Sequence, residues 1–578
     1  MFLPKLNNIA TSRDIVEVFK GYNHNLRIGD GEFYDMRNLT STYYPVLSPR
    51  AKRGTYLTTE NPLGMIAKDS LCYVDGSKFI INEHPIEMGL NDDPKQLISM
   101  GAYVIILPDK KYINTLDYTD KGDIEAEFIT TNDVTFSLCK LDGSDYENIS
   151  NIEPENPENM DLWLDTSSTP HSLKQYSETS KAWVTIATTY IKISSPNIGT
   201  AFKQYDGVTI SGIKAEALQD LNANMVLWEC KEDYVVVIGL LDAVTMQTVA
   251  EGAITISRKM PNMDFVMESE NRLWGCRYGT SINGAVVNEI YACKLGDFKN
   301  WNCFMQISTD SFVASCGTDG QFTGAIAHMG YPLFFKENCV HKVYGNYPSN
   351  FQIQTTACRG VQKGCSNSLA IVNEVLYYKS RNAVCAYDGS LPIEISAALG
   401  DVAYSDAVAC SYGNKYYISM KDTSDEYSLF VYDTSKGLWH KEDGLAVKHF
   451  CSCRNELYYI EKDSSVIRTM FGSGTTDTNP TDWMAETGVI GMYTPDKKYV
   501  SRLNVRMALD VGTNIYFYAQ YDSFGEWEHL GTMKGTSLRS FTVPIRPKRC
   551  DHFRVRIVGE GDAKIYSIVK TLEQGSDV

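Results

Sequence analysis

The sequence predicts an all-β protein: a β-propeller of about six blades with an inserted β-domain and a C-terminal β-sandwich. Three observations predict this. A short strand pattern returns about every forty residues, the length that a four-stranded blade needs. The chain is rich in aromatic residues, with 36 Tyr and 22 Phe, and these favour the pleated surface of a sheet. No long pattern has the period of an amphipathic helix.

Each copy of the repeat has a small or apolar pair, a polar turn, and then an apolar, aromatic strand. The copies lie at 64–81, 263–279, 325–345, 370–389, 409–432 and 450–470. Steps of 60, 43, 40 and 41 residues separate the anchors Leu273, Leu333, Leu376, Tyr416 and Leu457. The pattern predicts a first blade over 64–117 and the remaining blades over 261–472.

The repeat is interrupted once, after the first blade. A structureless loop of that length is implausible within a compact domain. The interrupting stretch also carries strand patterns of its own, such as Trp183–Ile193 and Tyr234–Leu240. We therefore expect one or two inserted β-domains over 118–260.

Two flanking segments complete the organisation. Residues 1–63 are predicted to form an extended N-terminal arm, in which 43–54 combines two prolines with a basic cluster. This arm is either a strand that closes the last blade or a segment that docks on a neighbouring subunit. Residues 482–578 alternate apolar and polar positions, as in Ser501–Met507, and predict a β-sandwich with one solvated face.

Charge and composition argue against several classes of protein. The net charge of −17 opposes a grip on nucleic acid by phosphate neutralisation, and it suits a soluble protein or a surface that DNA slides past. The sequence contains no run of roughly 18 apolar residues, so it predicts no membrane span. The 15 Cys lack the spacing of a disulfide framework or a zinc site. We therefore expect no metal and no other cofactor.

No catalytic constellation is recognisable in the sequence. It lacks a nucleophile elbow and a phosphate-binding glycine loop, and its 9 His are isolated. A sialidase needs an arginine clamp, a Tyr–Glu pair and an acidic residue. Four arginines are candidates for such a clamp, but none has a recognisable catalytic setting: Arg272, Arg277, Arg359 and Arg381. We expect a protein that is not an enzyme and assign no catalytic residue.

A hairpin with Tyr-Asp, Gly and Trp recurs, most clearly at Tyr432–Trp439 and Tyr521–Trp527. The Asp caps the turn, the Gly adopts a positive φ, and the Trp packs back onto the sheet. The hairpin resembles the Asp-box of sialidase-type propellers, which is a structural turn away from the active site. It therefore indicates a propeller or a sandwich and does not indicate a glycosidase.

Two basic clusters are candidate interaction sites. Arg50, Lys52 and Arg53 belong to the N-terminal arm, and Arg546, Lys548 and Arg549 belong to the C-terminal sandwich. The first cluster would dock on a neighbouring subunit. The second would contact DNA or an acidic partner, and its alternative interpretation is a solvated strand face.

The segments Gly21–Leu26, Asp35–Thr40 and Tyr44–Arg50 resemble bacteriophage virion proteins of the tail-hub and nozzle kind. The likeness extends to the propeller, the insertion and the sandwich. It implies a non-enzymatic structural protein of the virion tail or neck, made in the host cytoplasm. It also implies a homo-oligomeric ring of about six copies that contacts portal, adaptor or tail proteins. Such a ring retains packaged DNA and conducts it at ejection.

Two other functions remain open. The insertion and the sandwich would suit a carbohydrate- or receptor-binding tail protein, which exposed Trp or Tyr side chains would favour. The third candidate is a sialidase-like, glycan-cleaving propeller.

Overall fold

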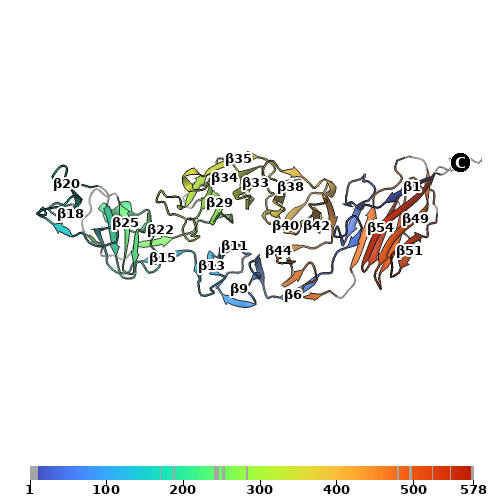
Figure 1. The fold of residues 1–578 in the computed structure, drawn as a ribbon, viewed down its shortest axis with the longest axis horizontal. Coiled ribbons are helices and arrows are strands. Elements are labelled where there is room, and N and C mark those ends of the chain that lie inside the picture. Colours follow the sequence, from blue (N-terminus) through green and yellow to red (C-terminus); the bar gives the residue numbers. More distant parts are fainter. Residues whose placement is uncertain are drawn as a thin grey trace, which may run out of the picture. The chain divides into compact units, whose positions relative to one another are not determined.

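The computed structural model describes residues 11–169, 171–186, 189–239, 247–249, 254–281, 284–477, 481–493, 497–523, 525–546 and 548–574. Regular structure in these ranges is almost entirely β-strand (Figure 1). The helices among them are short 3₁₀ turns: η1 (Glu216–Leu221), η2 (Pro348–Asn350), η3 (Ser366–Ser368) and η4 (Ala397–Leu399). None of these described helices has the length and apolarity to cross a membrane. The all-β class is confirmed.

The chain divides into two compact units. The first comprises 1–94, 335–340 and 356–578, and the second comprises 95–334 and 341–355. Both units contain small antiparallel groups of four strands that are consecutive or nearly consecutive in the chain, beside larger sheets.

The first unit contains four such groups. The strands of the first sheet are β7 (Pro62–Ala67), β8 (Leu71–Asp75), β9 (Lys78–Ile81) and β10 (His84–Glu87). The next sheet has β36 (Ala370–Val372), β37 (Val375–Lys379), β38 (Val384–Tyr387) and β39 (Ile393–Glu394). The third has β40 (Ser405–Tyr412), β41 (Lys415–Lys421), β42 (Tyr427–Asp433) and β43 (Leu438–Lys441).

The N-terminal segment completes the fourth sheet. This sheet contains β44 (Val447–Cys453), β45 (Glu456–Glu461) and β46 (Val466–Thr469), and β6 (Gly54–Thr58) pairs with β46. The short strand β47 (Thr475–Thr476) lies on the other side of β6. A strand that closes the last four-stranded sheet is one of the two arrangements that the sequence predicts for the N-terminal arm.

Apolar side chains join each sheet of the first unit to the next. One core contains Leu429 and Val431 of β42 together with Leu457 and Tyr459 of β45, and another joins Leu71 to Ile460 and Ile467. The contacts run between the first strands of successive sheets, from β36 to β40, from β40 to β44 and from β44 to β7. Burial of these faces is the main term that holds the sheets together.

The second unit repeats this packing. Its strands are β11 (Gln96–Met100), β12 (Tyr103–Leu107), β13 (Lys111–Asn114), β14 (Lys121–Asp123), β28 (Phe265–Ser269), β29 (Arg272–Thr280), β30 (Val286–Ala292) and β31 (Phe312–Ser315). Most of the sheet of β32 (Gly324–His328), β33 (Tyr331–Lys336), β34 (Cys339–Tyr344) and β35 (Gln352–Ala357) also belongs to this unit, apart from residues 335–340 and 356–357. First strands again meet, β11 with β28 and β28 with β32.

The segment predicted as one blade, 64–117, contains more than one sheet in the structure. Two sheets, β7–β10 and β11–β14, occupy this part of the chain and extend slightly beyond it. Their strands are only three to six residues long, so two sheets fit where the average spacing of the repeat predicts one. The turn at 88–94 separates them and ends in Pro94, which suits a chain that leaves one sheet for another.

The insertion between β14 and β28 forms three sheets around one core. Its strands are β15 (Ala126–Ile129), β16 (Val134–Cys139), β17 (Asn148–Ser150), β18 (Leu162–Asp165), β19 (Ser172–Ser177), β20 (Ala182–Thr185), β21 (Thr189–Ser194), β22 (Gly207–Ser211), β23 (Asn224–Val226), β24 (Glu229–Lys231), β25 (Tyr234–Gly239), β26 (Gln247–Val249) and β27 (Thr255–Arg258). Because β15 pairs with β27, the insertion begins and ends on neighbouring strands.

A close approach fixes the insertion on the loop after β30. The Gly207 N–H donates to Asn300 Oδ1 at 2.8 Å. A Cβ at Gly207 would lie 2.6 Å from the carbonyl carbon of Asn302, so only glycine fits there. Asp206 accepts hydrogen bonds from both Arg258 and Asn300 beside this contact.

The C-terminal sandwich takes strands from both ends of the chain. One sheet has the order β1 (Thr11–Val16), β54 (Ala563–Gln574), β49 (Lys498–Leu509) and β52 (Arg539–Val543). In Figure 1 the blue strand β1 lies beside β54 of the red C-terminal region. The other sheet contains β3 (Glu32–Arg37), β48 (Asp482–Thr487), β53 (Phe553–Glu560), β50 (Asn514–Tyr521) and β51 (Glu528–Lys534).

The predicted boundaries of the arm and of the sandwich therefore need correction. Strands β1 and β3 belong to the sandwich, and β2 (Gly21–Tyr22) links its second sheet to β43, which makes a ten-stranded sheet. The strands β4 (Leu39–Thr40) and β5 (Ser48–Pro49) pair with each other. An exposed sheet edge favours such added strands because they satisfy its free backbone groups. Residues 1–10 and 575–578 of the two predicted segments lie outside the described residues.

Candidate functional site

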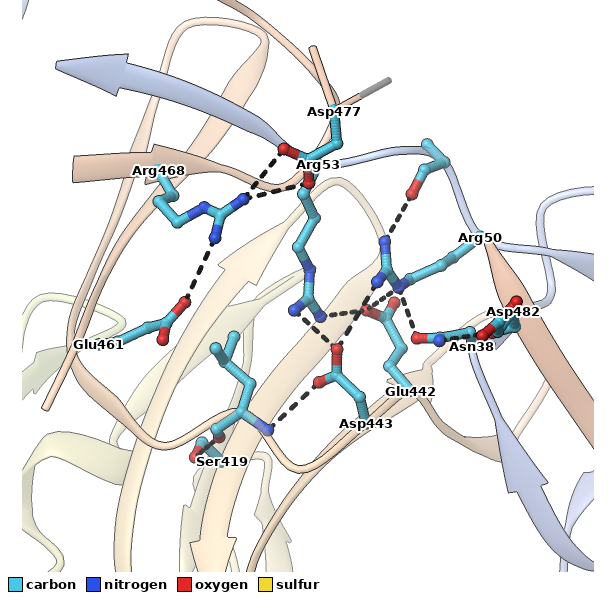
Figure 2. Close-up of polar contacts among 12 residues, drawn as sticks. Asn38, Arg50, Arg53, Ser419, Glu442, Asp443, Glu461, Arg468, Asp477 and Asp482 are labelled. Carbon is cyan, nitrogen blue, oxygen red and sulfur yellow. Dashed lines mark hydrogen bonds and ion pairs between the residues drawn. The ribbon is translucent and has the colours of Figure 1, made fainter. Parts of the chain in front are cut away.

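The first predicted interaction cluster is folded into the chain's own interior. Arg53 Nη2 lies 3.2 Å from Glu442 Oε2, and Arg53 Nη1 lies 2.7 Å from Asp443 Oδ2 (Figure 2). Arg50 makes longer contacts of 3.6 Å with both carboxylates. The side chains of Arg53 and Glu442 are only 8% and 5% exposed. Two guanidinium groups thus neutralise two carboxylates away from solvent.

The charged groups of this cluster lie at the ends of strands from two different sheets. Arg53 directly precedes β6, and Glu442 and Asp443 directly follow β43. Asn38 connects the two segments: its N–H donates to the Glu442 carbonyl at 2.5 Å, and its Oδ1 accepts from Arg50 Nε at 2.8 Å. Asn38 has a φ of 56°, a left-handed conformation that Asn tolerates better than most residues.

The electrostatics of the cluster favour a charged Arg53. Burial alone would lower its pKa, but Asp443, Tyr459 and Glu442 reverse this and hold the pKa above its ordinary value. Burial and the neighbouring Arg53 lower the pKa of Arg50. A buried pair of this kind is costly to break, because removing one partner leaves an uncompensated charge.

The cluster of Arg50, Lys52 and Arg53, predicted as a possible interaction site, has contacts within the chain itself. Arg50 and Arg53 already bind the chain's own carboxylates, and Lys52 is half-buried. Sequence reasoning missed Glu442 and Asp443. The only local signal for them is a pair of acidic residues directly after the Trp439 hairpin.

A second arginine on the same sheet anchors the linker that follows β46. Arg468 Nη2 lies 3.1 Å from both carboxylate oxygens of Asp477, and Arg468 Nη1 lies 3.8 Å from Glu461 (Figure 2). These side chains are partly exposed, so the contacts stabilise the linker less than the Arg53 cluster stabilises its surroundings.

The second predicted cluster stays on the surface. Arg546, Lys548 and Arg549 are exposed, and Pro547 between them lies outside the described residues. Lys548 pairs with Glu528, and its Nζ lies 5.4 Å from the centre of the Tyr521 ring. Both the partner patch and the solvated face are compatible with this placement.

Three of the four arginines named for a sialidase clamp have structural partners in their own units. The buried Arg272 donates to the carbonyls of Cys293, Asp310 and Ser308 at 2.6–2.9 Å. Arg359 forms a surface pair with Glu394 at 2.8 Å, and Arg277 donates to the Asn262 carbonyl. Arg381 lines a surface cavity of about 320 Å³.

The described residues contain two hydrogen-bonded Tyr–Glu pairs, Tyr499 with Glu573 between β49 and β54 and Tyr291 with Glu289 in the second unit. Tyr291 Oη donates to Glu289 Oε2 at 2.5 Å on β30. Burial and this hydrogen bond raise the pKa of Tyr291 above its ordinary value. A nucleophilic phenol needs the opposite shift, so this pair is not activated in the arrangement described.

Cavities and metal-ligating side chains add few candidates. Among the described residues, no group of three or more His, Cys, Asp and Glu is placed to hold a metal ion. A cavity of about 520 Å³ in the first unit is lined by residues of the N-terminal segment and the sandwich, including Phe19, Ile28 and Ile490. One of about 650 Å³ in the second unit lies beside Phe304, Ile307 and Tyr347.

Comparisons with known proteins identify no family. No family model and no curated protein matches the chain. Among solved structures, an exo-β-1,3-galactanase from Phanerochaete chrysosporium aligns with a TM-score of 0.22 and 8% identity, over 53% of this chain and 94% of that chain. The phage phi92 endosialidase aligns with a TM-score of 0.16 and 10% identity, over 80% and 69%. Likenesses this weak decide neither the fold nor the activity.

Proposed function

We propose that the chain is a non-enzymatic structural protein of a bacteriophage virion, built on a closed β-propeller and placed in the tail or neck. It assembles as a ring, contacts portal, adaptor or tail proteins, retains packaged DNA and conducts it at ejection. The sequence resemblance to tail-hub and nozzle proteins motivates this role.

The succession of four-stranded sheets carries the proposal. In the described residues five such sheets follow one another, and β40–β43 and β44–β46 with β6 form two further four-stranded parts of larger sheets, which together is one more than the repeat predicts. Within each unit the first strand of one sheet packs on the first strand of the next, as inner strands do around a propeller axis. Strand β6, from the start of the chain, completes the sheet of β44–β46, as expected for a ring closed by its two ends.

The charged groups support a structural role. The buried cluster of Arg53, Glu442 and Asp443 joins the N-terminal segment to the end of β43. Arg272 donates hydrogen bonds to backbone carbonyls at both ends of the loop between β30 and β31 and so stabilises that loop. The net charge of −17 suits a conduit that DNA passes without adhering.

Localisation in assembled particles tests the proposal. An epitope tag on the C-terminus, with gold-labelled antibody and negative-stain microscopy, should mark the tail or neck of particles of the encoding phage. The purified protein should form rings in the same stain. A stable monomer that is absent from purified particles would overturn the proposal. A tagged capsid protein serves as the labelling control.

A further inference from the structure

One face of the sandwich combines arginine and aromatic planes. We call it the Arg–aromatic face, and its residues are Tyr34, Glu486, Tyr518, Trp527, Arg554 and Arg556. The register pairs Glu486 with Arg556 and Arg556 with Tyr518, which places these side chains in one row across β48, β53 and β50. The alternate residues of these strands, such as Ala485, Ile557 and Phe517, are buried in the core. The row therefore points away from the core.

Glu486 holds the two arginines in a fixed orientation. Arg556 donates to Glu486 Oε2 from Nη2 at 2.6 Å and from Nε at 3.0 Å, and Arg554 Nη1 lies 3.2 Å from Glu486 Oε1. The Glu486 side chain is 6% exposed, whereas those of Arg554 and Arg556 are 22% and 33% exposed. The carboxylate is thus used within the protein, while both guanidinium groups remain reachable from solvent.

Aromatic rings lie against both guanidinium planes. The central carbon of Arg556 lies 4.0 Å from the centre of the Trp527 ring, and that of Arg554 lies 4.9 Å from the centre of the Tyr34 ring. His24 stacks on Tyr34 at 4.3 Å. These contacts restrict the side chains before any ligand arrives, which lowers the entropic cost of binding.

Donors and charge remain for a ligand. Two guanidinium groups oppose one carboxylate, so the face has a net positive charge within a chain of net charge −17. A ligand carboxylate suits such planar N–H donors. The apolar face of a sugar ring suits an exposed aromatic plane.

We propose that the Arg–aromatic face binds an acidic polysaccharide. A sugar ring stacks on Trp527 or Tyr518, and a sugar carboxylate accepts hydrogen bonds from Arg554 and Arg556. Single-stranded nucleic acid also stacks on aromatic rings, but it needs a groove with several positive charges along its phosphates. The single net charge here favours the sugar. This inference goes beyond the proposed structural role and does not depend on it.

Binding to the full-length protein tests the site. The probe is a fluorescently labelled oligomer of galacturonic acid, with a sialic acid oligomer as a second acidic probe, and anisotropy is the readout. A neutral dextran oligomer and a single-stranded dT oligonucleotide are comparison ligands. We expect binding of an acidic oligomer that weakens with salt, little binding of dextran, and weaker binding of the oligonucleotide.

Trp527→Ala should weaken binding of the acidic oligomer roughly tenfold, because it removes one aromatic ring on which a sugar stacks. The matched control is Tyr566→Ala, which removes an exposed aromatic side chain from β54 in the other sheet and should bind as the wild type does. Arg556→Lys keeps the charge but loses the planar fork, and it should also weaken binding. It carries the test if the melting curve shows that Trp527→Ala does not fold.

Several results would overturn the inference. They are no binding of either acidic oligomer, equal binding of dextran, tighter binding of the oligonucleotide, or unchanged binding in a folded Trp527→Ala or Arg556→Lys variant. None of these results bears on the location of the chain in a particle, so failure of this site is distinguishable from failure of the structural role.

Discussion

At the scale of residues, Arg53 is the buried charge on which the N-terminal segment depends most. Its guanidinium meets Glu442 and Asp443 where all three side chains are largely shielded from water. Replacing Arg53 with Met leaves two carboxylates near the more distant Arg50. We expect the free energy of unfolding of the first unit to fall by about 3–5 kcal/mol. Urea denaturation followed by tryptophan fluorescence measures this change.

Two further variants make that result specific to the ion pair. The exposed Lys20→Met variant removes a positive charge elsewhere in the N-terminal segment and should change stability by less than about 0.5 kcal/mol. The double variant Arg53→Met/Glu442→Met should lose less than the sum of the two single variants, with a coupling of roughly 1–3 kcal/mol. Strict additivity would show that the pair does not act as a unit.

His440 makes the stability of the same region depend on pH. Burial, with a contribution from Lys415 and against the opposing Asp433, lowers the pKa of His440 from 6.5 to about 3. The unfolded chain therefore binds this proton below pH 6.5, and the folded chain does not until pH falls to about 3. The contribution of His440 is complete above this window and is lost as the pH falls through it. The loss reaches about 2 kcal/mol near pH 5.

A non-titrating side chain should remove this part of the pH dependence. We expect His440→Gln to lose less stability than the wild type between pH values of about 7.5 and 5, as measured by denaturation at each pH. His84→Gln alters an exposed histidine and should retain the wild-type dependence. If His440→Gln loses as much stability as the wild type, the proton is not taken up at this site.

At the scale of elements, strand β6 lies so close to its neighbours that one methyl group should displace it. A Cβ on Gly54 would lie 2.7 Å from both the Ser473 carbonyl oxygen and Thr469 Oγ1. Gly54→Val should therefore weaken the sheet of β44–β46 by roughly 1–3 kcal/mol. Hydrogen exchange should speed up in β6 and β46. Thr55→Val, one residue along the strand, is the control, and equal protection in both variants would contradict this account.

Local patterns predicted local structure well. The hairpin at Tyr432–Trp439 forms as expected: Asp433 Oδ1 accepts from the Ser435 and Lys436 N–H groups at 3.1 and 3.2 Å, and Gly437 has a φ of 67°. All the atoms that decide this turn lie within a few residues of one another, so the sequence contains the information directly. For the copy at Tyr521–Trp527, Phe524 lies outside the described residues.

Partners that are distant in the sequence could not be predicted in the same way. Arg53 and Glu442 are 389 residues apart, and an arginine in a short basic cluster has the same local pattern whether it is buried or exposed. The pairing of β1 with β54 could not be predicted either, because alternation of apolar and polar residues predicts a strand but not which strand pairs with it. The Arg–aromatic face depends on the register of three strands, which is set by the whole sandwich.

At the scale of the whole molecule, charge should decide how the protein meets DNA. A chain of net charge −17 repels a polyanion except where basic residues gather. Arg546 and Arg549 are the exposed candidates for such a contact. The proposed conduit requires that DNA passes without adhering. We therefore expect duplex DNA to bind with a dissociation constant above about 0.1 mM at physiological salt. Anisotropy of a labelled duplex over a salt series measures this affinity.

Charge reversal at that cluster separates the two interpretations of it. If Arg546 and Arg549 lie on a solvated face, the Arg546→Glu/Arg549→Glu variant should bind duplex DNA as weakly as the wild type at every salt concentration. If they contact phosphates, the wild type should bind at low salt with a measurable salt dependence. The variant should then reduce the slope of log K against log salt by about 2, since each lost phosphate contact contributes about 0.9. Tight binding that the variant abolishes would contradict passage without adhesion and would make this cluster a DNA contact.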